Sequence, residues 1–141
     1  MRVMAIDYGD SRTGIAVSDP MGMLVGATEV LCAYTQEKVV AGIAECAKKY
    51  SADAIVMGLP RNMDGTEGAR AELCRQVAAM VKEATGLEVT LWDERRTTVD
   101  AHRILSDNNV YGKKRKQTVD AVAASLILEG YLDFLKNKKQ P

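Results

Sequence analysis

The sequence predicts a single α/β domain, residues 1–141, built on a five-stranded mixed sheet with helices on both faces. The chain has 141 residues, of which 47% are hydrophobic and 27% charged, which is the size and composition of one globular domain. Short apolar segments typical of strands fill the first 35 residues, and helical and strand-like segments alternate after them. Three successive strands favour an antiparallel meander, whereas the later alternation favours strands parallel to the first. We therefore expect the first strand at the centre of the sheet.

The individual elements follow from apolar spacing and from residues that favour turns. Strands are expected at 3–6, 14–18, 24–31, 54–57 and 87–92, and helices at 36–50, after the polar loop that follows residue 60, at 97–109 and from 118 onward. Thr35 suits the N-cap of the first helix, and Asp64 with Glu67 resembles a capping box for the second. The apolar face of the second helix is expected at Leu73, Val77, Met80, Val81 and Ala84. Residues 108–117 are predicted to form a mobile basic loop, and residues 136–141 a frayed tail.

Composition excludes several classes of function. Lys plus Arg and Asp plus Glu number 19 each, so any binding to a polyanion must come from local clusters of charge. Aromatic residues make up only 5%, which argues against a base-stacking platform. Three widely spaced cysteines form neither a disulfide framework nor a zinc motif and suggest buried free thiols. With no signal peptide and no apolar stretch of the roughly 18 residues that a membrane span needs, we expect a cytoplasmic protein without a membrane partner.

Acidic residues follow two of the predicted strands. Asp7 comes directly after the first strand, and Asp93 and Glu94 follow the fifth. If these strands are parallel, Asp7 and Glu94 lie at the same end of the sheet, and the last helix can bring Asp120 to them. Clustered carboxylates attract hard divalent cations such as Mg²⁺ or Mn²⁺, and two such ions can hydrolyse a phosphodiester bond. We therefore predict Asp7, Glu94 and Asp120 as catalytic residues and metal ligands.

Each of these acids also has a purely structural interpretation. Asp120 suits the positive end of a helix dipole. Asp93 and Glu94 can be turn residues that pair with neighbouring arginines, and Asp7 can be a turn former. Gly9, two residues after Asp7, favours the functional interpretation, because glycine lets a ligand approach the backbone. The number of metal ions, and the choice between Asp93 and Glu94, stay open at this point.

Basic residues gather in the same part of the chain. Seven of them against two acids between residues 95 and 118 give a local excess of five. Such a run is most often a solvated segment, but beside an acidic site it can bind the phosphate backbone of a nucleic acid. The candidate nucleic-acid-binding residues are Arg95, Arg96, Lys113, Lys114, Arg115 and Lys116.

Four sequence blocks, in order from residue 5 to about residue 128, resemble the YqgF/RuvX family. They are Ala5-Ile6-Asp7-Tyr8-Gly9 with Arg12-Thr13-Gly14-Ile15-Ala16, Gly58-Leu59-Pro60 with Asn62-Met63-Asp64-Gly65, Asp93-Glu94-Arg95 with Thr97-Thr98, and Val119-Asp120-Ala121-Val122-Ala123-Ala124. The resemblance implies an RNase H-like fold and a metal-dependent nuclease that matures the 5′ end of the 16S rRNA precursor in the bacterial cytoplasm. The acids that match the family's pattern are Asp7, Glu94 and Asp120. We expect structured RNA and pre-ribosomal particles as partners, and a monomer or weak homodimer.

Three other functions compete with this one. The family is related to the RuvC Holliday-junction resolvases, which suggests branched DNA as a substrate. RuvC carries its second carboxylate on the strand after the first helix, where this chain has Gly58-Leu59-Pro60, so Glu94 must substitute for it. The segment from Asp7 to Gly14 also resembles the phosphate loop of the actin/hexokinase superfamily, whose members close two such domains around a nucleotide. The third alternative is a non-catalytic RNA-binding factor in ribosome assembly.

Overall fold

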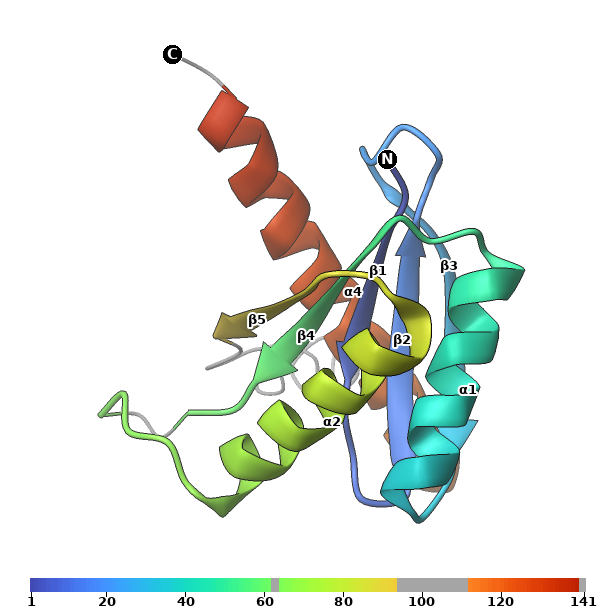
Figure 1. Ribbon diagram of the computed structural model, residues 1–141, viewed down its shortest axis with the longest axis vertical. Helices are drawn as coiled ribbons and strands as arrows, with labels where there is room; N and C mark the ends of the chain where they lie inside the picture. The colour runs from blue at the N-terminus through green and yellow to red at the C-terminus, as the bar shows by residue number, and fades with distance from the viewer. Residues whose placement is uncertain (62–63, 94–111, 140–141) are drawn as a thin grey trace.

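The computed structural model describes residues 1–61, 64–93 and 112–139, and for residues 112–120, 138 and 139 it describes the backbone only. The strands are β1 (Val3–Asp7), β2 (Arg12–Ser18), β3 (Val25–Cys32), β4 (Ala54–Leu59) and β5 (Val89–Asp93). The helices of the described ranges are α1 (Gln36–Lys49), α2 (Ala69–Thr85) and α4 (Gly112–Lys139), and they lie on both faces of the sheet (Figure 1).

The strands form one mixed sheet in the order β3-β2-β1-β4-β5, with β1 at the centre as predicted. β1 pairs antiparallel with β2 and parallel with β4, β2 pairs antiparallel with β3, and β4 pairs parallel with β5. Because β1, β4 and β5 are parallel, all three end on one side of the molecule, at Asp7, Leu59 and Asp93. We call this side the carboxyl end of the sheet.

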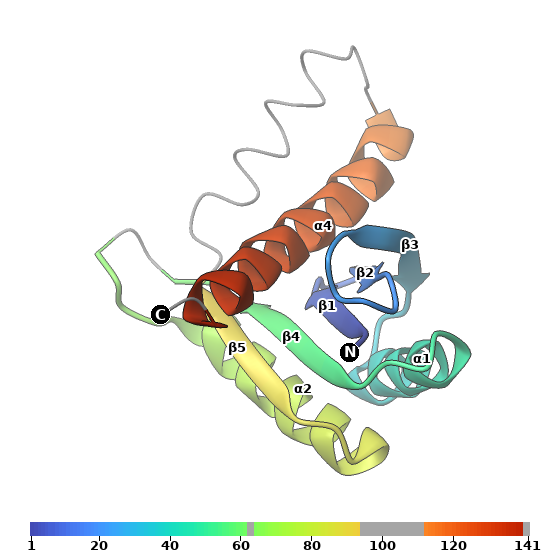
Figure 2. The ribbon, with the colours of Figure 1, turned by 90° about the horizontal axis from the view of Figure 1, so that it is seen from above.

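Each face of the sheet is covered by helices, and the two faces have separate cores. Met4 and Ile6 of β1 belong to the core under α1 and α2, whereas Val3 and Ala5 belong to the core under α4. Figure 2 shows the same division, with α4 on one side of the sheet and α1 and α2 on the other. This alternation is the normal period of two in a strand that is buried on both faces.

The beginnings of the first two described helices differ in how they are capped. The Thr35 hydroxyl accepts a hydrogen bond of 3.2 Å from the backbone N–H of Lys38, which confirms the predicted cap of α1. The capping box predicted for α2 is wrong, because the helix begins after Gly68. Asp64 instead accepts a hydrogen bond of 2.9 Å from the backbone N–H of Thr66 in the preceding turn.

The burial of the apolar residues of α2, and that of the cysteines, differs in part from expectation. The residues of α2 that are buried are Ala71, Cys74, Val77, Ala78 and Val81, whereas Leu73 and Ala84 are exposed. The small residues Ala71 and Ala78 are therefore part of the core that α1, α2 and the sheet share. Cys46 and Cys74 are buried free thiols, as expected, but Cys32 is exposed.

Helix α4 is longer at both ends than the sequence predicted. It begins at Gly112 rather than Thr118, so residues 112–117 are helical and not part of a loop. Its last residues, 136–139, are helical as well, where a frayed tail was expected. Lys, Arg and Gln favour helix, so a basic polar run can extend a helix as readily as form a loop. Residues 108–111 and the helix expected at 97–109 lie outside the described residues. In the described part of the chain, no helix combines the length and the apolar character needed to cross a membrane.

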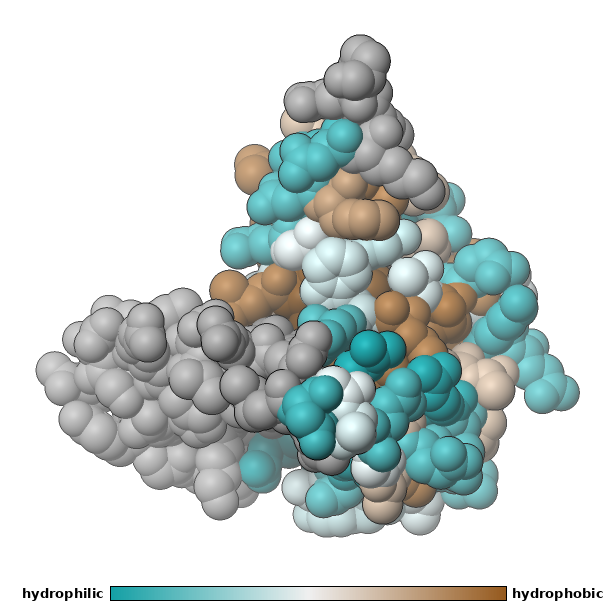
Figure 3. Space-filling view, turned by 90° about the vertical axis from the view of Figure 1, so that its left-hand side faces the viewer, coloured by the Kyte–Doolittle hydropathy of each residue, from teal (hydrophilic) through white to brown (hydrophobic). Residues whose placement is uncertain are grey.

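The carboxyl-terminal half of α4 is held against β5 by aromatic side chains. Trp92 of β5 makes edge contacts with Tyr131 and Phe134, at ring-centroid distances of 5.8 and 5.7 Å. A side-chain carbon added at Gly130 would lie 3.4 Å from the Trp92 ring, an ordinary van der Waals distance, so the indole packs directly over this position of the helix. Figure 3 shows this side of the molecule, where pale and brown residues gather between the helix and the sheet.

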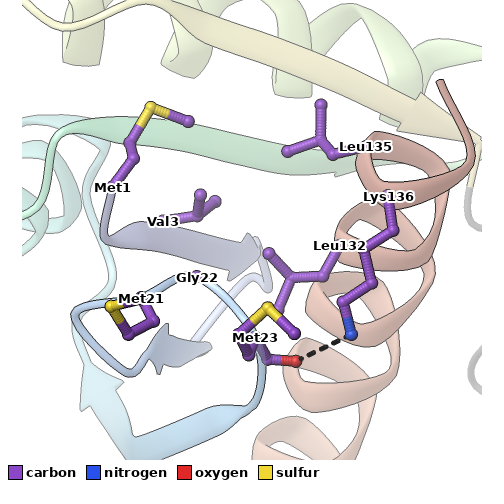
Figure 4. Close-up of a pocket in the computed structure, with 8 residues that line it drawn as sticks. All are labelled: Met1, Val3, Met21, Gly22, Met23, Leu132, Leu135 and Lys136. Atoms are coloured by element: carbon purple, nitrogen blue, oxygen red, sulfur yellow. Dashed lines mark hydrogen bonds between the residues drawn. The ribbon is translucent and has the colours of Figure 1, made fainter. Parts of the chain in front are cut away.

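Beyond β5, α4 reaches the amino end of β1. Leu132, Leu135 and Lys136 line a small apolar hollow together with Met1 and Met23, and the Lys136 ammonium donates a hydrogen bond of 3.3 Å to the Met23 carbonyl oxygen (Figure 4). The carboxyl-terminal part of α4 therefore lies where β1 begins, and the helix runs from there back toward the carboxyl end of the sheet.

A pH-dependent contact connects β3 to the end of α1. The Glu29 carboxylate accepts hydrogen bonds from the Tyr50 hydroxyl and from Lys49 Nζ, the latter at 3.0 Å. These bonds, Tyr50 first, lower the pKa of Glu29 below its ordinary value of 4.5. Since the carboxyl is more acidic in the folded state, its stabilisation is complete above that ordinary value and is lost as the pH falls through the lowered pKa.

We expect Glu29→Gln to lower the melting temperature near pH 7 by about 3 °C, which corresponds to about 1 kcal/mol for a partly exposed charged hydrogen bond. The difference from wild type should shrink as the pH falls below about 4. Thermal denaturation followed by circular dichroism between pH 7 and pH 3 measures both effects. Glu83→Gln, at an exposed position of α2, is the control and should change little. A difference for Glu29→Gln that is constant down to pH 3 contradicts the assignment.

Candidate functional site

Asp7 is the last residue of the central strand and is half-buried at the carboxyl end of the sheet. Val3 and Ala5 face α4, so the period of two along β1 places Asp7 on the α4 face as well. Tyr8, the next residue, packs against the core under α1 and α2, as this alternation requires. Asp7 therefore extends from a rigid strand toward the face that α4 crosses.

The backbone of α4 brings Asp120 to the same end of the sheet. Leu132 and Val3 share one core cluster at the amino end of β1. From residue 132 back to residue 120 is twelve residues, or about 18 Å of helix. From Val3 to Asp7 is four residues, or about 13 Å of strand. Even with α4 inclined to β1 (Figure 2), the helix at position 120 reaches the level of Asp7, although the Asp120 side chain lies outside the described part.

Of the two acids at the end of the fifth strand, the structure describes Asp93. It pairs with Leu59 across β4 and β5, and Leu59 is buried in the core under α1 and α2. Paired residues in adjacent strands share a face, so Asp93 lies on the face opposite Asp7. Asp93 is therefore poorly placed to share a ligand with Asp7. Glu94 lies outside the described residues and stays a prediction.

The metal site and the basic residues are tested only in part. Among the residues that the structure describes, no three His, Cys, Asp or Glu side chains lie close enough to hold a metal ion. Glu94 and the Asp120 side chain lie outside the described part of the chain. Arg95 and Arg96 also lie outside the described residues, and Lys113, Lys114, Arg115 and Lys116 are placed by their backbone in the first turns of α4.

The turn that follows Asp7 is tightly constrained. A side-chain carbon at Gly9 would lie 2.0 Å from the Arg12 carbonyl oxygen, so only glycine fits this position without a backbone shift. The Ser11 carbonyl oxygen accepts a hydrogen bond of 3.1 Å from the backbone N–H of Ala33, which ties the turn to the end of β3. The glycine that the sequence pointed to is therefore explained by close packing of the backbone.

Arg70, which sequence analysis did not single out, binds this turn from α2. Its Nη2 donates a hydrogen bond of 2.7 Å to the Tyr8 carbonyl oxygen, its Nη1 donates to the Asp10 carboxylate, and its guanidinium lies 5.0 Å from the centre of the Tyr8 ring. One signal was available in the sequence: a basic residue in the first turn of a helix is opposed by the helix dipole, which suggests a specific partner.

A second arginine contact stabilises the segment before α2. Arg75 Nε and Nη2 donate to the two Glu67 carboxylate oxygens, each at 2.8 Å, and Arg61 Nη2 lies 3.7 Å from one of them. These hydrogen bonds, with Arg75 the largest cause, lower the pKa of Glu67. The pairing connects the segment before α2 to the second turn of the helix.

A family model described as "RuvX: Holliday junction resolvase" matches residues 1–134. The chain belongs to this family. A relative from Halothermothrix orenii, named "Putative pre-16S rRNA nuclease", is 43% identical over 134 residues, which are 95% of this chain and 96% of the relative. A relative of the same name from Bacillus cytotoxicus is 44% identical over 136 residues, which are 94% of this chain and 98% of the relative.

Similarity to solved structures confirms the RNase H-like fold. Thermus thermophilus RuvC in complex with a Holliday junction has a TM-score of 0.63 at 17% identity, covering 100% of this chain and 99% of that one. The Fowlpox virus resolvase in complex with junction DNA has a TM-score of 0.59 at 13% identity, covering 96% and 99%. A ROK hexokinase from T. thermophilus has a TM-score of 0.50 at 22% identity, but this chain spans only 38% of that enzyme. The chain is therefore a member of a nuclease family, and its likeness to the hexokinase is one of fold.

We expect Gly9→Ala to lower the melting temperature by about 5 °C or more, because the added carbon forces the Arg12 carbonyl to move and such overpacking costs about 1–3 kcal/mol. Gly68→Ala is the matched control, since a side-chain carbon at Gly68 meets nothing within 4 Å. Differential scanning calorimetry of both variants measures the effect. Equal melting temperatures for the two variants would show that the turn adapts and is not constrained by this contact.

Proposed function

We propose that this protein is a divalent-metal-dependent nuclease that cleaves structured RNA, with the 5′ end of the 16S rRNA precursor as its substrate in the cytoplasm. The observation that carries the proposal is the half-buried Asp7 carboxylate at the end of the central strand, on the face where α4 carries Asp120. The family and the names of relatives over nearly the whole chain support the chemistry and the substrate.

Asp7, Glu94 and Asp120 are the residues proposed to hold Mg²⁺ or Mn²⁺. Three carboxylates offer the hard oxygen donors that these cations prefer, and without a cation their mutual repulsion would favour protonation of some of them. When bound, the metal would activate the attacking water and stabilise the leaving oxygen. Asp7 is the central ligand in this proposal because it stands on the most constrained strand of the sheet.

The basic residues of α4 are proposed to bind the phosphate backbone beside this site. Because residues 112–120 are helical, Lys113 and Lys116 stand about 10 and 6 Å from Asp120 along the helix axis. These cations are therefore held on the same rigid element as a metal ligand. Contacts with phosphates position a nucleic acid without reading its sequence, so the site is expected to recognise shape rather than bases.

Branched DNA is the second candidate substrate, and one observation favours it. The model that matches residues 1–134 is described as that of a Holliday junction resolvase. The RNA substrate ranks first because two relatives are named as pre-16S rRNA nucleases. Both are more than 40% identical to this chain and match it over nearly their full length. A cleavage assay that offers both a 16S-precursor leader RNA and a four-way DNA junction separates the two.

Asp7→Asn should reduce cleavage by about 100-fold or more, because it removes an anionic ligand while keeping the side-chain shape. Mn²⁺ should raise the melting temperature of the wild type and leave that of Asp7→Asn unchanged, since only the native wild-type site would bind the ion. Asp120→Asn should behave in the same way, and Asp133→Asn, at an exposed position of the same helix, is its control.

Two outcomes would contradict the metal site. One is cleavage by the wild type in excess chelator, and the other is full activity of Asp7→Asn. If the wild type binds the leader RNA but cleaves neither substrate with either metal, the non-catalytic assembly factor becomes the better account of the protein.

Replacing Lys113, Lys114, Arg115 and Lys116 together with Ala should weaken nucleic-acid binding and reduce the slope of log affinity against log salt by roughly 3 to 4, because up to four phosphate contacts are lost. Fluorescence anisotropy at several salt concentrations measures this slope. Lys48→Ala with Lys82→Ala is the control, since both lysines lie in the last turns of α1 and α2, away from the carboxyl end of the sheet. An unchanged slope in the fourfold variant would mean that these cations are only solvated.

A further inference from the structure

We infer that Arg70 is a positioning residue that sets the direction of the Asp7 carboxylate, an inference that rests on the proposed function of Asp7. Arg70 belongs to the first turn of α2, sixty residues from the turn that it binds. It contacts that turn in three ways: through the Tyr8 carbonyl oxygen, through the Asp10 carboxylate, and through the face of the Tyr8 ring.

Tyr8 directly follows Asp7, the last residue of β1, and packs on the face opposite Asp7, so the position of Tyr8 constrains the direction of Asp7. The Tyr8 ring packs against the core under α1 and α2, and the Arg70 guanidinium lies beside it. A rotation of the strand end that turned Asp7 away from the α4 face would have to move the Tyr8 ring and break its carbonyl hydrogen bond. The three contacts of Arg70 therefore resist this movement.

The chemistry of the guanidinium suits this role better than that of an ammonium. Its planar fork donates in two directions at once and stacks on an aromatic ring, whereas a lysine offers a single charged point. The Arg70 side chain is 35% exposed and its partner Asp10 is 87% exposed, so the ion pair alone contributes little to stability. The effect of the three contacts is to hold the backbone and the Tyr8 ring in one orientation at the end of β1.

Arg75 provides a matched control on the same helix. Its side chain is 47% exposed and forms a two-pronged pair with Glu67, which lies in the segment before α2 and not in the turn after Asp7. Arg70→Met and Arg75→Met each remove one guanidinium and one ion pair while keeping an apolar stem. A difference between the two variants therefore reports on the contacts with Tyr8 and Asp10.

The test measures kcat and KM for cleavage of the leader RNA and, separately, the Mn²⁺ concentration that half-saturates the rise in melting temperature without nucleic acid. Arg70→Met should lower kcat by about 10- to 100-fold with KM within about two-fold, since a displacement of 1 Å at a reacting centre can cost about 100-fold. It should also raise the half-saturating Mn²⁺ concentration. Arg75→Met should change none of these by more than about two-fold, and Arg70→Lys should recover only part of the loss.

Several results would overturn the inference. Unchanged kcat in Arg70→Met, or equal losses in Arg70→Met and Arg75→Met, would exclude a positioning role. A higher KM and a smaller salt slope with kcat intact would make Arg70 a substrate contact instead. If Arg70→Met does not fold, Asp10→Ala decides, because that exposed side chain can be removed without unfolding and should lower kcat to a smaller extent.

Failure of the proposed function is distinguishable from failure of this inference. A wild type that cleaves no substrate contradicts the function, whereas the Mn²⁺ titration still compares Arg70→Met with Arg75→Met. A wild type that neither cleaves nor binds Mn²⁺ contradicts both.

Discussion

The parallel pairing of β1 with β4 determines at which end of the sheet the central strands finish, and with it where the candidate site can lie. β1 is a run of four apolar residues, Val3 to Ile6, at most 1% exposed, because it is covered by α1 and α2 on one face and by α4 on the other. A slip of one residue would move every side chain of this strand into the opposite core, where the packing does not match its size. Its first polar residue, Asp7, therefore leaves the core at a fixed place and on a fixed face. The ends of β4 and β5 come to the same place because they run in the same direction.

Local sequence predicted most of this framework, since its signals are short-range. The order of elements, the mixed sheet, the central first strand and the Thr35 cap follow from patterns within a few residues. The predicted start of α4 was wrong because a basic polar run is compatible with both a loop and a helix, and the residues around it determine which one forms. The cap of α2 was wrong because Asp64 and Glu67 found other partners, Thr66 and Arg75.

Features of the site that depend on distant contacts could not be predicted in this way. The face of Asp93 became known only from its pairing with Leu59, because register between strands is set by the whole sheet. Arg70 was missed since its partners, Tyr8 and Asp10, lie some sixty residues earlier in the chain. The group of side chains at one end of a sheet is thus easier to predict from sequence than the residues that hold those side chains in place. The same sheet also occurs in resolvases and in a hexokinase, so the fold alone does not determine the chemistry.

Helix α4 joins two distant parts of the molecule through one rigid rod. Part of its packing lies near the amino end of β1, where Leu132 and Val3 share one core cluster and Lys136 donates to the Met23 carbonyl oxygen. A helix turns by about 100° per residue, so a slip of one residue there would swing every position in its amino-terminal half to a different side. The rotation of the helix backbone near position 120 therefore depends in part on contacts at the opposite end of the sheet, which include a hollow lined by methionines.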